Sequence, residues 1–484
     1  MSIVSIDAGQ QSRSRTLQEL FKYPFMSCLA ERRTRRVPKG VSLDAGPLSW
    51  TSKNEPEPLT KLEEAVLVAS LGVTGVTTHD GPLVKPGGQE LGTPFLHAVA
   101  RTGSSADNCQ ATSFFLINDD GISLIRQPQG RAALELLRDL PPKWADWQEE
   151  DWIHAAQSVK VKVSDRRVDF PREYPYYLGW NAQMSNKPGT TLFFPVVDCT
   201  RQYINAIAIL LSEPEGKRPV FIDDWQPFRP KTFKELLAWV AAKLGFVDPI
   251  PYQPIGGLKW IDRKFVNKNN AAPLGFGATL RTDYECFFYF QNLMLVGQAL
   301  GLGGWIHGSV FPPYIYMDKP EKGWHGLGFR FQEPKKLRRF PPVPGSQPNP
   351  IGIDGILEGL TPPYVKSMDE AVDKVVDEKY GPSGNYGDVK VFSRAYNSVE
   401  HAEAYLKNAR HFSKDAIAYT KDICNYLYDT YGRFPAHVDA YYSPGMWLQF
   451  SHLELEYYDR FYDPAQFARQ HARAEWGDGE RGGR

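Results

Sequence analysis

Cysteine is scarce in this sequence of 484 residues, which contains only five. They are Cys28, Cys109, Cys199, Cys286 and Cys424, and no two of them form a Cys-x-x-Cys pair. The spacing excludes the common zinc-ligand and thioredoxin-like motifs. An odd and unpatterned set of cysteines is typical of reduced thiols in a cytoplasm.

Net charge and long hydrophobic runs are also missing. Lys and Arg number 56, as do Asp and Glu, so the formal charge is zero, which argues against a general nucleic-acid or membrane-surface binder. The longest apolar stretches, such as residues 204–211, fall far short of the roughly 20 residues that span a bilayer. The N-terminus also lacks the profile of a signal peptide. We therefore expect a soluble, cytoplasmic, globular protein that binds neither nucleic acid nor membrane.

Several catalytic motifs are absent as well. The sequence has no Gly-x-Ser-x-Gly elbow and no P-loop. The glycine-rich stretch 301–304 follows a predicted helix and precedes a strand, which is the reverse of the order in a dinucleotide-binding Rossmann unit. The chemistry must therefore be sought in other segments.

Local patterns predict the main elements. Residues 1–20 are polar and are expected to form an arm, with a helical period beginning near Phe21. Thr60 followed by Glu63 predicts the N-terminal cap of a helix that begins at Lys61. Asn118 to Gly121 predicts a hairpin turn. Further helices are expected at 131–140, 233–244 and 285–300, and strands at 192–194 and 305–306.

The tail, residues 366–470, is expected to be mainly helical. Aromatic residues recur in it every seven residues, at Tyr405, Phe412, Tyr419 and Tyr426. Seven-residue spacing places side chains on one face of a helix, and we expect this face to be ordinary packed core.

Two segments could bind a ligand. Residues 32–36 combine four arginines with Thr34, just after a predicted helix, and guanidinium and hydroxyl groups suit a phosphate dianion. Residues 103–110 form a small polar loop with Ser105, Asn108 and Gln110. Together they offer cations for the phosphate and polar groups for the ring edge of flavin mononucleotide (FMN). Taken singly, the first is more typical of a solvated basic turn or a nucleic-acid contact, and the second of a turn that satisfies its own backbone.

Considered in order with a third segment, these residues resemble the nitroreductase family of flavoproteins. Family members begin with an Arg-Arg-Ser-x-Arg-like turn, which residues 32–36 match, and continue with a Pro-Ser-x-x-Asn-x-Gln-like loop, which residues 104–110 match. A later helix ends in Leu-Gly-Leu-Gly before Trp-Ile-x-Gly, as residues 300–308 do. Ala111 and Thr112 stand where Pro-Trp often follows the loop, and the loop has one extra residue.

The resemblance covers roughly residues 20–345, without the middle segment 140–280. Residues 58–75 with the hairpin are most similar to the azoline-oxidising dehydrogenases of peptide-modifying clusters, and residues 328–341 look like a closing strand and basic tail. The resemblance implies an α+β fold, a nitroreductase-like antiparallel sheet flanked by helices. The implied organisation is an arm (1–20), a flavin domain (21–345) with an inserted or divergent segment (140–280), a linker or extended wrap (346–379) and a helical C-terminal extension (380–484).

The resemblance also implies a cofactor and a chemistry. The cofactor is FMN, held at the interface of a homodimer, and the activity is two-electron or hydride transfer through flavin N5 to or from a small organic or peptide-derived substrate, with NAD(P)H as a possible donor. The backbone of His307 and Gly308 would approach N5. The residues expected to contact FMN are Arg32, Arg33, Thr34, Arg36, Ser105, Asn108, Gln110, His307, Gly308, Arg338 and Arg339.

Two alternatives remain open. One is a binding or scaffold protein that keeps the fold without flavin. The other is a metal-dependent enzyme centred on the tail, where His437 with Asp439 and His452 with Glu454 and Glu456 are chemically suitable ligands. Such histidines are more often satisfied structural groups, so we expect no metal site.

Overall fold

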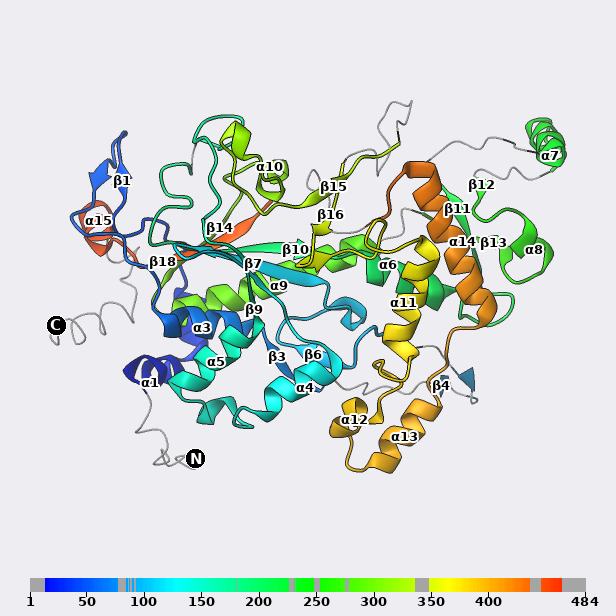
Figure 1. Cartoon of the computed structure of the whole chain (residues 1–484), viewed down its shortest axis with the longest axis horizontal. Helices are drawn as coiled ribbons and strands as arrows, with labels where there is room; N and C mark the ends of the chain where they lie inside the picture. The colour runs from blue at the N-terminus through cyan, green and yellow to red at the C-terminus, as the bar shows by residue number, and fades with distance from the viewer. Residues whose placement is uncertain are drawn as a thin grey trace.

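We describe the protein from a computed structural model. The structure describes residues 14–463 except 77–83, 86, 88, 91–92, 180, 226–229, 231, 248–252, 275–277, 336–347 and 436–444. Helices and strands are mixed along the chain, and a central sheet organises the molecule (Figure 1).

The central sheet has six strands, and every neighbouring pair is antiparallel. Asn118 and Gly121 close the hairpin between β7 and β8, as predicted, and Gly121 has a φ of 113°, which favours glycine. In spatial order the strands are β14 (Gly303–His307), β18 (Trp447–Ser451), β10 (Thr191–Val197), β7 (Thr112–Asn118), β8 (Gly121–Ile125) and β9 (Lys160–Ser164).

Two interior strands come from segments that were expected to lie outside the core of the flavin domain, although the strand predicted at residues 192–194 is confirmed as part of β10. β10 lies in the segment expected as an insertion, and it pairs with β7 on one side and β18 on the other. β18 lies in the segment expected as a helical extension, and it pairs with β14 and β10. The middle segment and the tail therefore both build the central sheet.

Three helices cover one face of the sheet: α3 (Lys61–Ser70), α5 (Glu149–Val159) and α9 (Ala278–Ala299). α3 begins with the predicted capping box, in which Thr60 and Glu63 bond reciprocally. α9 ends near Gly301, which has a φ of 72° and so permits the turn into β14. Phe114, Phe193 and Phe450 of the sheet pack against these helices.

The opposite face of the sheet is covered mainly by loops. Phe115, Phe194 and Trp447 pack there against Tyr316 and Phe329. The short elements on this side are α10 (Pro312–Tyr316), β15 (Arg330–Gln332), β16 (Asn349–Ile353) and β17 (Leu357–Glu358).

A second layer of helices packs beside a small three-stranded sheet. The helices are α6 (Thr200–Leu210), α11 (Met368–Tyr380) and α14 (Lys414–Tyr431), and the sheet has the order β12 (Gln253–Pro254), β11 (Pro219–Asp223), β13 (Asn267–Pro273). The remaining elements are α1 (Arg15–Lys22), α2 (Phe25–Glu31), α4 (Gly130–Arg138), α7 (Phe233–Lys243), α8 (Lys259–Asp262), α12 (Val389–Phe392), α13 (Val399–Lys407), α15 (Leu455–Phe461), β1 (Ser42–Leu43), β2 (Trp50–Thr51), β3 (Val73–Val76), β4 (Val84–Lys85), β5 (Gln89–Glu90) and β6 (Val99–Arg101).

Two local expectations need correction. Helix begins before Phe21, because α1 already covers residues 15–22 within the expected arm and Leu17 is fully buried. The aromatic repeat of the tail is split between elements, because α13 ends before residue 408 and α14 begins at Lys414. Tyr405 packs on Phe392, whereas Tyr419 stacks on Trp260.

Within the described residues, no helix is long and apolar enough to cross a membrane.

Candidate functional site

The arginine turn, residues 32–36, lies between the C-terminal half of α9 and α15. α2 precedes it, and Cys28 donates its thiol hydrogen to the carbonyl of Leu295 on α9 at 2.9 Å. At the other end of the turn, the backbone N–H of Arg36 donates to the Tyr458 hydroxyl at 2.8 Å. These bonds fix the backbone of the turn on the body of the protein.

The side chains of the turn have few partners. Arg32 Nη1 lies 3.8 Å from the sulfur of Met294, and Arg33 bonds to nearby backbone carbonyls. The Arg36 guanidinium lies 5.7 Å from the ring centroid of Trp305 on β14. Thr34, Arg33 and Arg36 are exposed, and no described carboxylate forms an ion pair with Arg32, Arg33 or Arg36. The turn therefore presents positive charge to solvent.

The fourth arginine differs from its neighbours. Arg35 is buried, and burial lowers the pKa of its guanidinium. The tyrosine ring of Tyr458 beside it partly opposes that shift. Arg35 is therefore part of the support of the turn, whereas Arg32, Arg33 and Arg36 are its solvent-facing cations.

The polar loop 104–110 uses its amides within the chain. Asn108 donates to the carbonyl of His97 at 2.6 Å, and Gln110 donates to Asn108 Oδ1 at 2.7 Å and to the carbonyl of Val99. Asp107, Asn108 and Gln110 all have φ values near +50°, a region that favours glycine. Local bonding thus holds the loop in a strained conformation.

A buried glutamate that the sequence analysis did not single out supports this loop. Glu285 of α9 is 1% exposed and accepts hydrogen bonds from Ser105 Oγ at 2.6 Å and from the backbone N–H of Thr112 at 2.9 Å. The Glu285 carboxylate also accepts a hydrogen bond from the backbone N–H of Ala111. The sequence signal for this role was an acidic residue that begins a strongly apolar stretch of the helix, residues 285–300.

His307 lies inside the protein at the end of β14. Its ring stacks on Trp305 with centroids 3.9 Å apart, and Nδ1 lies 2.7 Å from Ser309 Oγ. Burial lowers the pKa of His307 to about 3, the charge of Arg36 lowers it further, and a contact with Gln449 opposes the shift. Gly308 is the next residue in the chain, and it lies close to the backbone carbonyl of Gly445.

The structure brings two of the three segments together. Arg36 touches Trp305, so the arginine turn adjoins β14 and His307. The polar loop is held at Glu285, and the turn contacts Met294. Nine residues of α9 separate these two points, which is roughly 14 Å along the helix. The loop and the turn thus lie apart within one chain.

Four expected residues lie outside the described part of the chain. These are the arginines proposed as a second phosphate contact and the first histidine pair of the tail, namely Arg338, Arg339, His437 and Asp439.

The second histidine of the tail joins a buried polar cluster. His452 follows β18 directly, so it shares neither a strand nor a helix with Glu456. Its Nε2 lies 3.2 Å from an oxygen of Glu63, and both side chains are buried. Glu454 accepts bonds from Ser52 and Asn54. In the part of the chain that the structure describes, no group of three or more acidic, histidine or cysteine side chains suits a metal ion.

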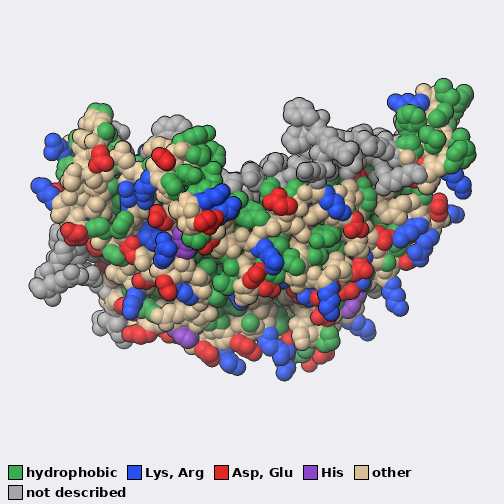
Figure 2. Space-filling model, turned by 45° about the horizontal axis from the view of Figure 1, so that its top comes forward, with side chains coloured by type: hydrophobic (Ala, Val, Ile, Leu, Met, Phe, Trp, Pro, Cys, Tyr) green, Lys and Arg blue, Asp and Glu red, His purple; other side chains and the backbone are tan. Residues whose placement is uncertain are grey.

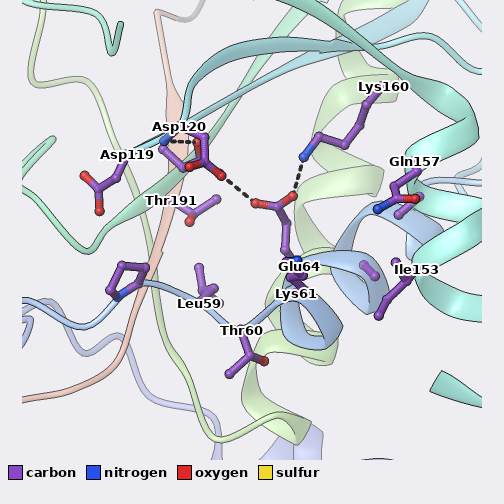
Figure 3. Close-up of a pocket in the computed structure, with 14 residues that line it drawn as sticks. Leu59, Thr60, Lys61, Glu64, Asp119, Asp120, Ile153, Gln157, Lys160 and Thr191 are labelled. Atoms are coloured by element: carbon purple, nitrogen blue, oxygen red, sulfur yellow. Dashed lines mark hydrogen bonds and ion pairs between the residues drawn. The ribbon is translucent and has the colours of Figure 1, made fainter. Parts of the chain in front are cut away.

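A small cavity opens between α3, α5 and the β7–β8 hairpin (Figure 3). Its volume is about 260 Å³. Glu64 projects into it, forms an ion pair with Lys160 and accepts a hydrogen bond from Asn118 at 2.7 Å. Asp119, beside it, forms an ion pair with Arg167 at 2.8 Å. These charged side chains of the cavity wall are matched by partners in the chain itself.

We compared the chain with protein-family models, curated proteins and solved structures, and none of them matches.

Proposed function

We propose that the protein is an FMN-dependent oxidoreductase of the nitroreductase type that acts as a homodimer. When bound, FMN would supply two-electron or hydride transfer at its N5 atom. The substrate would be a small organic or peptide-derived molecule, with NAD(P)H as a candidate donor. The observation that carries the proposal is the arginine turn.

The turn has the chemistry of a phosphate site. Arg32, Arg33 and Arg36 have no ion-pair partner among the described carboxylates, and Thr34 adds an exposed hydroxyl. Cations that are not neutralised within the protein favour an anionic ligand, and guanidinium groups bind phosphate through paired hydrogen bonds. The anchored backbone keeps these groups in place before a ligand arrives.

Two buried aromatic side chains of β14 lie beside the turn. Arg36 lies over Trp305, which stacks on His307, so a cation, an indole and an imidazole are adjacent. His307 is neutral at physiological pH because its pKa lies far below 7. The positive charge beside a bound ring would therefore come from the arginines.

A second copy of the chain would bring the polar loop to the arginine turn. The exposed stripe of α9 includes Arg281, Tyr284, Phe288 and Gln291, a spacing that places them on one side of the helix. If two α9 helices pair antiparallel on this side about a two-fold axis that passes near residues 289–290, toward the C-terminal end of the stripe, Glu285 of one helix lies opposite Met294 of the other. The loop of one subunit then faces the turn of its partner.

Replacement of Arg32 and Arg36 by alanine tests the proposal. We expect FMN affinity to fall about 100-fold or more, because two charge-assisted contacts to phosphate are removed. The measurement is FMN titration by flavin fluorescence, together with the flavin content of the purified protein. The matched control is Arg166→Ala, which removes an exposed arginine elsewhere and should leave affinity unchanged.

A colourless wild-type protein that also fails to take up added FMN would overturn the proposal. That outcome would favour the second candidate, a flavin-free binding or scaffold protein. One observation favours it already: the amides of Asn108 and Gln110 are bonded within the chain.

A further inference from the structure

The most unusual surface of the described chain is a protruding helical arm. We define the α7 arm as residues 232–247, which comprise α7 and the turn after it. α7 stands away from the body at the end opposite α1, and no residue of α7 is buried (Figure 1). Figure 2 shows hydrophobic side chains gathered on the knob at that end.

The arm is apolar on most of its circumference. At 100° per residue, Phe233, Leu236, Leu237, Val240 and Leu244 share one side, and their exposed fractions range from 41% to 74%. Trp239 lies on the other side and is also exposed, as is Phe246 beyond the helix. A helix with this composition normally lies in a protein interior.

The arm is nevertheless a well-formed element. Thr232 and Glu235 form a reciprocal capping box at its first turn. Such a cap satisfies two backbone donors without help from the rest of the fold. Leu244 and the turn after it close the other end through bonds to the carbonyls of Val240 and Ala242. The arm is thus folded but has no apolar partner in the described chain.

The same chain carries a second exposed apolar surface. Fourteen of the nineteen large hydrophobic side chains that are exposed among the described residues lie in three places: eight in the arm, four on α1–α2 and two on α9. The members outside the arm are Phe21, Phe25, Met26, Leu29, Tyr284 and Phe288. Exposure is therefore concentrated on surfaces that could cover one another.

We propose that the α7 arm of one subunit packs on the α1–α2 surface of a second copy of this chain. The inference rests on the homodimer of the proposed function. α2 packs on the C-terminal half of α9, through Cys28 and Leu295, and α7 lies at the other end of the molecule (Figure 1). Antiparallel pairing of two α9 helices would therefore bring the end that carries each arm beside the end of the partner that carries its α1–α2 surface.

A second copy fits the arm better than a lipid surface does. A bilayer would cover one side of the helix and leave Trp239 in water, whereas the groove between two helices encloses several sides. Lys234, Glu235 and Lys243 give the arm a net charge of only +1, so attraction to anionic headgroups is weak. A stable interface buries roughly 800 Å² per partner, and the exposed apolar residues of both surfaces would contribute to it.

The arrangement has a functional consequence. Met26 and Leu29 come just before the arginine turn, so the partner's arm would form a wall beside the proposed phosphate site. The arm would then exclude water and limit the size of the substrate.

Crosslinking tests the contact directly. All five native cysteines are buried, so the full chain can carry single engineered surface thiols. We would mix Leu237→Cys with Met26→Cys and add a short bismaleimide. We expect a covalent dimer from the mixture and none from either variant alone. Glu403→Cys, on the exposed face of α13, is the matched control and should not crosslink with Met26→Cys.

A second variant measures how much the arm contributes to the affinity of the dimer. Leu237→Ser with Val240→Ser should weaken dimerisation about 100-fold or more in sedimentation equilibrium, because two central apolar contacts are lost. Both residues are exposed in the single chain, so the melting temperature of the monomer should not change. Lys234→Ser is the control for the effect of a serine substitution on the α7 helix itself.

Three outcomes would overturn the inference: a monomer at all concentrations, an unchanged dimer constant for the double variant, or arms that bind lipid vesicles instead of crosslinking. FMN titration of the same samples separates the two proposals. If the protein binds flavin but the double variant has an unchanged dimer dissociation constant, the arm contact alone is rejected. If the engineered thiols crosslink but the dimer takes up no flavin, the proposed function alone is rejected.

Discussion

Asp283 is a half-buried carboxyl group on α9. Burial raises its pKa to about 6, and its Oδ1 has no hydrogen-bond partner among the described residues. The unfolded chain has an aspartate pKa near 3.9, so the folded state binds more protons between about pH 4 and pH 6. Stability therefore falls as pH rises through that window, by roughly 3 kcal/mol in total.

We expect Asp283→Asn to stabilise the protein, because it removes the uncompensated charge. The gain should be roughly 2–3 kcal/mol at pH 8 and much smaller at pH 4.5. Urea unfolding at the two pH values measures it. Asp262→Asn, at an exposed site on α8, should change neither value. A variant that is less stable at pH 8 would show that Asp283 has a stabilising partner.

His307 makes a contribution to stability that changes with pH in the opposite direction. Its pKa in the folded protein is about 3 because it is buried, whereas the unfolded value is near 6.5. As pH falls from 6.5, the unfolded state takes up the proton first, and stability is lost. We expect the stability difference between pH 7 and pH 5 to shrink by about 2 kcal/mol in His307→Gln. The exposed His154 serves as control through His154→Gln, and equal pH dependence in both variants would contradict the assignment.

At the scale of elements, the sequence predicted the helix ends and turns that are determined by bonds between residues close in sequence. Thr60 with Glu63 marks the start of α3, and Asn118 to Gly121 marks the hairpin, because the groups that form each feature are close in sequence. The end of α9 before Gly301 is likewise determined by residues that are close in sequence. These elements were predictable without knowledge of the rest of the chain.

Nonlocal pairing explains what the sequence did not reveal. Trp447 to Ser451 is a short apolar strand between a long helix and an aromatic helix, and only its pairing with β14 and β10 places it in the sheet. The polar loop is similar. Its residues were identified, but the acceptor that holds it, Glu285, is 180 residues away from Ser105. Sequence patterns identified the candidate site residues, and tertiary contacts decided which of them meet.

The contact between α9 and β18 depends on a glycine inside the helix. A Cβ at Gly297 would overlap the ring of Phe450. Alanine is favoured over glycine by about 1 kcal/mol in a helix, but overpacking a core usually costs about 1–3 kcal/mol. We therefore expect Gly297→Ala to be destabilising overall. Phe450→Leu in the same chain should recover part of the loss, and a double-mutant cycle from urea unfolding measures that coupling.

At the scale of the whole molecule, the separation of the turn and the loop along α9 is the central fact. Within one chain the two segments lie apart, and the two-fold dimer that we propose would join them. The apolar arm, the α1–α2 surface and the exposed stripe of α9 all lie on parts that such a dimer would cover. The proposed two-fold dimer would thus account for both the exposed apolar residues and the divided site.

A mixed dimer tests whether the site is shared. One parent carries Arg32→Ala with Arg36→Ala, and the other carries Ser104→Trp at the exposed start of the loop. If each site takes its turn from one subunit and its loop from the other, neither parent binds FMN. In a heterodimer one site is then doubly altered and the other is intact. Random reassembly gives heterodimers in half of the population, so about one quarter of all sites should bind FMN again. Flavin fluorescence after unfolding and refolding an equimolar mixture measures this fraction. Recovery of no sites would place the turn and the loop of each site in the same subunit, because every site would then still contain one altered segment.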